Sequence, residues 1–193
     1  MTLLLLLGGA GPVAAVVINF DNLAAGVVVS SQYPEATFSS TAGFVNLTAA
    51  QSLGSSLPNI ICTGPAGGGT IDCTHETIVT FTSPVSGLTF LEIGDNNEGV
   101  NALVDVFVNG VLAATVGAVG DADGFVPNLV DLSAFSNVTS IRIHSISDVA
   151  GLGWDDFTFT VGASQVPEPG TVLLLGAAGI ALAVAGWRRG GRN

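Results

Sequence analysis

The sequence has 193 residues, enough for one domain with a proper hydrophobic core. It carries 15 aspartates and glutamates against 4 arginines and no lysine, for a net charge of −11. Three of the arginines follow Trp187, so Arg142 is the only fixed positive charge of the remaining chain. Because nucleic-acid binding needs Lys and Arg to neutralise phosphates, this balance excludes a nucleic-acid partner. It is compatible with divalent cations as partners, although we favour the interpretation that acidity keeps an exported protein soluble.

Residues 1–15 resemble a secretory signal peptide. A leucine run occupies residues 3–7, and Val-Ala-Ala at 13–15 matches a small-residue cleavage site. We therefore expect export and cleavage after Ala15. No basic residue precedes the leucines, although signal peptides normally have one. A true start upstream of Met1 would explain this, and a short buried segment is the alternative.

Residues 16–162 show the period of β-strands. Runs rich in β-branched or aromatic residues predict strands at 16–20, 77–81, 88–93, 103–108, 140–144 and 157–161. The Asn109-Gly110 pair predicts a two-residue hairpin. Turn residues recur between these runs, and no helical period is present. We expect an all-β domain, an antiparallel jelly-roll-like β-sandwich of about eight to ten strands.

Cys62 and Cys73 are the two cysteines of the chain, separated by a segment rich in glycine and threonine. In an exported protein, such a pair predicts a disulfide that closes one loop. The alternative is a metal site that also uses His75. One cysteine pair supplies too few soft ligands for zinc, so we favour the disulfide.

A calcium site is predicted where the first and last strands meet. These strands commonly pair antiparallel in a jelly roll, which would bring Asp21 close to Asp156. Two carboxylates, Asn22 and main-chain carbonyls would form a hard oxygen site suited to a structural calcium ion. The alternative is that both aspartates are turn residues bonded to their own backbone.

Two other acidic groups fall in predicted loops. One spans residues 92–98 and includes Glu92, Asp95 and Glu98, and the other is Asp-Ala-Asp-Gly at 121–124. Neither fits the twelve-residue calcium loop with its terminal glutamate. Loops at one end of a sandwich often bind ligands, but they are also where solvated Asp and Asn gather. We interpret both groups as solvated loops.

Catalytic motifs are missing from the sequence. It has no Gly-x-Ser-x-Gly elbow, phosphate loop, dinucleotide fingerprint or His-Glu-x-x-His. His75 and His144 are the only histidines, and His144 shares a predicted strand face with Arg142, which we expect to be exposed. We therefore expect a protein that is not an enzyme. A pair of acids would suffice for a glycosidase, so a polysaccharide-acting hydrolase remains an alternative.

The C-terminal residues fall into three consecutive parts. Residues 163–170 form a linker with Val-Pro-Glu-Pro-Gly, residues 171–187 are apolar and uncharged, and residues 188–193 are basic. About 17 apolar residues rise roughly 25 Å, the lower limit for a transmembrane helix. The positive-inside rule places Arg188 and Arg189 in the cytoplasm, so the body would lie outside.

This tail resembles the PEP-CTERM sorting signal, with Pro167, Glu168 and Pro169 as its motif. The resemblance implies an exosortase-type membrane protease as partner, a cut near the motif, and a Gram-negative producer of extracellular polysaccharide. The two prolines suit a processing site because they keep the segment extended. A plain tail anchor is the alternative.

The body resembles, more loosely, the β-sandwich ectodomains and carbohydrate-binding modules found ahead of such tails. The resemblance rests on Phe-Asp-Asn-Leu at 20–23, Tyr33-Pro34 and Gly-Trp-Asp-Asp-Phe-Thr-Phe at 153–159. It implies a non-catalytic protein of the cell surface, extracellular matrix or biofilm that associates with polysaccharide. Of the aromatics that could stack on sugar, we interpret Trp154 as a core residue. A structural or adhesive protein that binds other proteins is the alternative.

Overall fold

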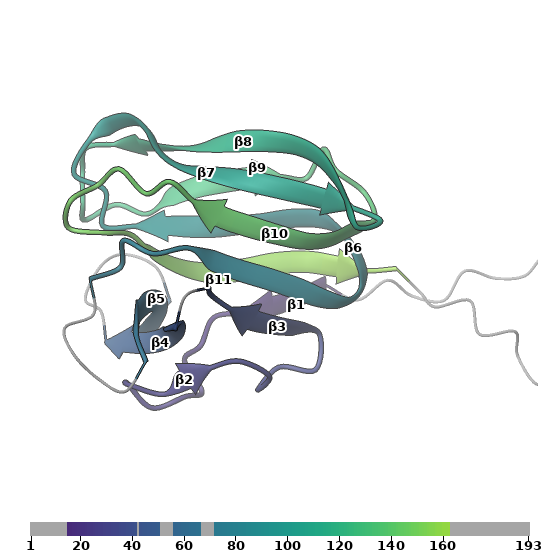
Figure 1. Ribbon diagram of the computed structural model, residues 1–193, viewed down its shortest axis with the longest axis horizontal. Coiled ribbons are helices and arrows are strands. Elements are labelled where there is room, and N and C mark those ends of the chain that lie inside the picture. The colour runs from purple at the N-terminus through teal and green to yellow at the C-terminus, as the bar shows by residue number, and fades with distance from the viewer. Residues whose placement is uncertain (1–14, 42, 51–55, 67–71, 163–193) are drawn as a thin grey trace, which may run out of the picture. The chain divides into compact units, whose positions relative to one another are not determined.

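The computed structural model describes residues 15–41, 43–50, 56–66 and 72–162, and within them every regular element is a strand. The strands are β1 (Ala15–Ile18), β2 (Val28–Val29), β3 (Ala36–Ser39), β4 (Phe44–Ala50), β5 (Asn59–Pro65), β6 (Thr77–Ile93), β7 (Glu98–Val108), β8 (Val111–Asp121), β9 (Asn128–Leu132), β10 (Val138–His144) and β11 (Gly153–Val161). The predicted all-β fold is confirmed for this part of the chain (Figure 1).

All strand pairs are antiparallel and join into one continuous sheet in the order β2-β4-β5-β11-β6-β10-β7-β8. Strand β1 pairs with β11, and both β3 and β9 pair with β6. The first part of β6 lies between β3 and β10, whereas its last part lies between β11 and β9. One long strand therefore belongs to two layers, and the sheet curls into a sandwich (Figure 1). The predicted strands at 77–81 and 88–93 are the two parts of β6.

The core is dominated by aromatic side chains. Phe20, Phe38 and Phe157 contact one another edge to face, with ring centroids 5.3 to 6.0 Å apart. Phe157 also stacks on Phe90, which meets Trp154 edge to face at 5.8 Å. These geometries are the favoured ones for aromatic pairs. Trp154 is fully buried, so it is a core residue rather than a platform for sugar.

Two predicted strand connections are confirmed. The first and last strands pair antiparallel, from Ala15 opposite Thr160 onwards. The β7–β8 hairpin turns at Asn109 and Gly110, whose φ angles are 51° and 78°. Positive φ at both positions is the requirement of a type I′ turn, which Asn-Gly meets at little cost.

Loops 94–97, 122–127 and 145–152 gather at one end of the sandwich, here called the loop end. They connect β6 to β7, β8 to β9 and β10 to β11, and the strand register brings these connections together. The Asn109-Gly110 hairpin, Ala15 and Gly162 lie at the opposite end. The described body therefore begins and ends far from the loop end (Figure 1).

None of the described residues forms a helix that is long and apolar enough to cross a membrane. The predicted transmembrane helix at 171–187, the linker at 163–170 and the basic tail at 188–193 lie outside the described residues. Residues 1–14 of the predicted signal peptide do so as well, and Ala15 is the first residue of β1.

Candidate functional site

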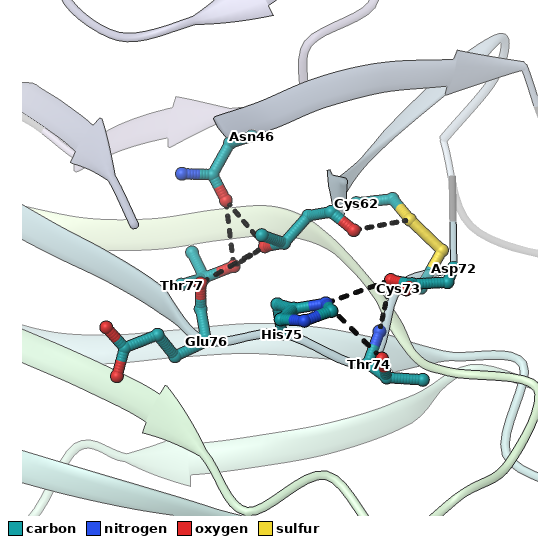
Figure 2. Close-up of a disulfide and its surroundings, with 9 residues drawn as sticks. Asn46, Cys62, Asp72, Cys73, Thr74, His75, Glu76 and Thr77 are labelled. Atoms are coloured by element: carbon teal, nitrogen blue, oxygen red, sulfur yellow. Dashed lines mark hydrogen bonds and ion pairs between the residues drawn. A yellow bond between two sulfur atoms is a disulfide. The ribbon is translucent and has the colours of Figure 1, made fainter. Parts of the chain in front are cut away.

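Cys62 and Cys73 form the predicted disulfide, with Cα atoms 5.0 Å apart (Figure 2). Cys62 is fully buried on β5. The backbone N–H of Cys73 donates to the Thr63 carbonyl at 3.1 Å, and its own carbonyl accepts from the Leu152 N–H at 3.0 Å. The bridge therefore ties the segment before β6 both to β5 and to loop 145–152.

The disulfide removes the zinc alternative, because both sulfurs are used in the bridge. His75 instead stacks on Phe44 and places Nδ1 3.1 Å from the Asp72 carboxylate. Figure 2 shows the imidazole turned toward Asp72 and Thr74 beside the bridge. We assign His75 a structural role in this segment.

The predicted calcium ligands lie around the turn after β1 and the start of β11. Asp21 Oδ1 accepts from the Asn59 N–H at 3.2 Å, and Asn22 Oδ1 accepts from the Tyr33 hydroxyl at 2.7 Å. Asp156 is half-buried, with a positive φ of 50°. Asp21 and Asn22 thus already act as hydrogen-bond acceptors, but for distant residues rather than for their own turn. A calcium ion shared with Asp156 stays a prediction.

Asp155 is the buried carboxylate of this region, although the sequence pattern favoured its neighbour. It is fully buried, and it accepts from the Ser56 hydroxyl at 3.1 Å and from the Asp156 N–H at 2.8 Å. Burial raises the pKa of the Tyr33 hydroxyl, and the charges of Asp21 and Asp155 raise it further. The carboxylate that accompanies Asp21 near Tyr33 is therefore Asp155.

The loop end contains two carboxylates that the sequence analysis wrongly interpreted as solvated, Glu92 and Asp95, whereas Glu98, Asp121 and Asp123 are exposed as expected. Asp95 is fully buried. Its Oδ2 accepts from the Ala122 N–H and its Oδ1 from the Asn128 amide, both at 2.8 Å. This carboxylate fastens loop 94–97 to loop 122–127 and to the start of β9, so its role depends on burial rather than on solvation.

Asp148, which no sequence pattern singled out, connects the remaining loop. It is 1% exposed, and its Oδ2 accepts from the Asn96 N–H at 2.7 Å. Its Oδ1 accepts from the Ala150 N–H at 2.8 Å, which closes a turn within loop 145–152. Two buried aspartates therefore join all three loops. Hydrogen bonds between loops this far apart in sequence depend on how the strands pair, so the sequence alone does not predict them.

Glu92 is the most unusual side chain of the loop end. It follows Leu88 and Phe90 on the inward face of β6 and is fully buried. Neither carboxylate oxygen has a hydrogen-bond partner of good geometry among the described residues. Burial raises its pKa to about 7; the nearby Asn101 amide opposes the shift, and the charges of Asp95 and Asp148 add to it. A buried carboxylate without a counter-charge is strongly destabilising when it is ionised.

Two backbone features make room for polar groups next to Glu92. Strand β7 has an irregular register between Val100 and Ala102, and both Asn101 and Ala102 are buried. Such bulges re-aim a side chain, here the Asn101 amide, which donates to the Asn97 carbonyl at 2.9 Å. On β8, a Cβ at Gly120 would overlap Asn101 and Asp95. Glycine is therefore required there by the polar cluster.

The rim of the loop end exposes apolar side chains. Phe125 is 76% exposed and Val149 is 96% exposed. The Phe125 N–H donates to Asp123 Oδ1 at 3.1 Å, and the Asp123 N–H donates to Asp121 Oδ1 at 3.0 Å. In each of these Asx turns, an aspartate side chain accepts from the N–H two residues later, and two successive turns hold the backbone of the loop in one conformation. An exposed aromatic ring thus closely follows two exposed carboxylates in the chain.

Arg142 and His144 share the outer face of β10, as expected, and both have acidic partners. The Arg142 guanidinium contacts Glu76 at 2.6 Å, and His144 Nε2 lies 3.2 Å from Asp105. The Thr115 hydroxyl, donating at 2.6 Å, is the main cause of the lowered pKa of Asp105, with His144 also contributing. Arg142 is therefore already paired with Glu76 on the outer face of the sheet.

Among the described residues, no three His, Cys, Asp or Glu side chains converge closely enough to hold a metal ion by themselves.

One family model matches the chain, the PEP-CTERM protein-sorting motif, over residues 165–190. This range contains Pro167, Glu168, Pro169, Arg188 and Arg189, all of which lie outside the described residues. The match indicates an exported protein that is processed by exosortase from a membrane-anchored precursor. No curated protein matches the chain.

Proposed function

We propose that this chain is a non-catalytic envelope or matrix protein of a Gram-negative bacterium, whose sandwich associates with extracellular polysaccharide. The observation that carries the proposal is the sorting motif at 165–190 behind a disulfide-bonded, acidic β-sandwich. Residues 171–187 stop transfer in the inner membrane, Arg188 and Arg189 set the orientation, and cleavage near Pro167-Glu168-Pro169 releases the body.

The loop end is the proposed contact surface for the saccharide. Sugar-binding modules stack an aromatic face on a sugar ring and bond its hydroxyls through flanking carboxylates and amides. Phe125 is the strongly exposed aromatic of the described residues, and the exposed Asp121 and Asp123 closely precede it in the chain. The surface lies at the end of the body opposite Gly162, from which the chain continues to the sorting motif. This arrangement supports a jelly-roll-like carbohydrate-binding module.

A second candidate is an adhesive protein that binds other proteins. Strand β8 ends the sheet order, and it exposes the apolar residues Val111 (69%), Leu112 (51%) and Val119 (57%). An edge strand with exposed apolar residues can add a strand from a partner protein. Val111 and Leu112 lie at the Asn109-Gly110 hairpin, at the end opposite Phe125, so substitutions there separate the two candidates.

The test is co-sedimentation of the purified protein with saccharide polymers, including the polysaccharide of the producing organism. We expect Phe125→Ala to lower binding at least tenfold, whereas Val111→Ala, an exposed apolar control at the opposite end, leaves it unchanged. Failure of the unaltered protein to bind any saccharide would refute the polysaccharide proposal. Loss of binding to envelope proteins in the Val111→Ala variant would favour the adhesive candidate.

Processing is tested separately, by mass spectrometry of the mature protein. We expect its C-terminus to lie near Pro167-Glu168-Pro169 and the full tail to persist in a strain that lacks exosortase. A mature protein that keeps residues 171–193 in a strain with active exosortase would show that the tail is an ordinary anchor.

A further inference from the structure

Glu92 needs a compensating charge that the described residues do not provide. The groups around it are the Asp95 and Asp148 carboxylates and the amide of Asn101. Trp154, opposite Glu92 on β11, has an indole N–H that likewise has no partner, but this donor is neutral. Arg142 is paired with Glu76 elsewhere. An orphaned buried carboxylate of this kind indicates a bound ion or a bound proton.

We propose that a calcium ion binds at the loop end between Glu92 and Asp95, with amide and main-chain oxygens completing its coordination. Calcium takes six to eight oxygen ligands and accepts Asn and main-chain carbonyls beside carboxylates. Two carboxylates from the chain therefore suffice for such a site.

The geometry around Asp95 is suited to an ion. Both of its oxygens accept one hydrogen bond, which fixes the carboxylate and leaves a lone pair on each oxygen for a ligand bond. The bulge at Asn101 brings a buried amide close to Glu92, and the Asn101 Nδ2 and Asp95 Oδ2 atoms occupy the space that a Cβ at Gly120 would take. Fixed first ligands with supporting hydrogen bonds are characteristic of metal sites.

The ion would join the last residues of β6 to loop 94–97, and through Asp95 to loop 122–127. Phe125 belongs to that loop, so the ion would also stabilise the surface proposed to contact saccharide. The site is separate from the predicted one at Asp21, Asn22 and Asp156. It would exist whether or not the protein binds polysaccharide.

The experiment uses the full chain in detergent micelles, first stripped with a chelator. Calcium is added from 10 μM to 10 mM, a range that covers the affinity of about 10⁻⁴ to 10⁻³ M typical of extracellular sites. Binding is measured by titration calorimetry and by the melting temperature. A Trp187→Phe background makes Trp154, next to Glu92, the sole source of indole fluorescence.

We expect one calcium ion per chain, a rise in melting temperature of about 4 °C or more, and a change in Trp154 fluorescence. Glu92→Gln should weaken binding at least tenfold. Glu98→Gln, an exposed glutamate of the same acidic segment, and Asp21→Asn, at the other candidate site, should keep all three responses.

Calcium binding that survives Glu92→Gln but is lost in Asp21→Asn would overturn the proposal in favour of the other site. No calcium response up to 10 mM would also overturn it, and would mean that a proton neutralises Glu92. Because none of these readouts involves a saccharide, failure here and failure of the polysaccharide proposal are distinguishable.

Discussion

Removal of the Cys62–Cys73 bridge is expected to destabilise the sandwich by an amount set by the loop that it closes. The cysteines are separated by 11 positions, and for a loop of this size the chain-entropy relation gives about 3 kcal/mol at 25 °C. The bridge also holds Cys73 where its backbone pairs with Thr63 and Leu152. Its loss should therefore loosen β5 and loop 145–152 together.

The assay is urea unfolding of the oxidised protein, of the same protein under a strong reductant, and of the Cys62→Ala/Cys73→Ala variant. We expect both bridge-free forms to lose about 2 to 4 kcal/mol with nearly unchanged m-values. His75→Ala, which removes a half-buried contact in the same segment but keeps the bridge, should cost less than about 1 kcal/mol. Equal midpoints for oxidised and reduced protein would show that the segment is ordered without the bridge and would refute this reasoning.

Three further predictions concern single residues of the body. In a chelator, the raised pKa of Glu92, about 7 against 4.5, gives this group a contribution to stability that is fully present below pH 4.5, and about 3 kcal/mol of it is lost as pH rises through 7. Glu92→Gln should abolish this slope in pH-dependent urea unfolding, and a slope that persists would contradict the assignment. The lowered pKa of Asp105 stabilises the fold above the ordinary aspartate pKa, and this stability is lost as pH falls through the folded value. Thr115→Val should raise that pKa in a carboxyl NMR titration; no change would mean that the hydroxyl is not its main cause. Gly151→Ala and Gly26→Ala both place alanine at positive φ, but only at Gly151 would the new Cβ overlap the main chain at the disulfide. Thermal melts should show Gly151→Ala as less stable by at least about 1 kcal/mol, and equal melts would contradict the close packing.

Local signals account for the parts of the structure that were predicted correctly. Alternating β-branched residues marked the strands, and Asn109-Gly110 marked a hairpin because few other dipeptides tolerate positive φ at both positions. Cys62 and Cys73 paired as expected because the chain offers no other cysteine. The sorting motif at 165–190 is likewise readable as consecutive residues.

The candidate site was not predictable in this way. Glu92 and Asp95 look like members of a solvated acidic loop, yet both are fully buried, because β6 continues to Ile93 and carries Glu92 inward in the row of Leu88 and Phe90. The sequence analysis likewise chose Asp156 rather than Asp155 as a calcium ligand. Asp155 is the buried one of the two, and burial depends on which strands cover a residue.

The sequence by itself determined that the chain is exported, all-β, acidic and tailed by a sorting motif, because each of these properties follows from neighbouring residues or from composition. Only the tertiary structure decided which carboxylates meet at the loop end. Residues 92, 95, 101, 120 and 148 come from different strands and loops, and a register shift of one residue at the β7 bulge decides whether Asn101 faces them. Long-range pairing, which no local pattern encodes, therefore creates the buried charge on which the proposed calcium site depends.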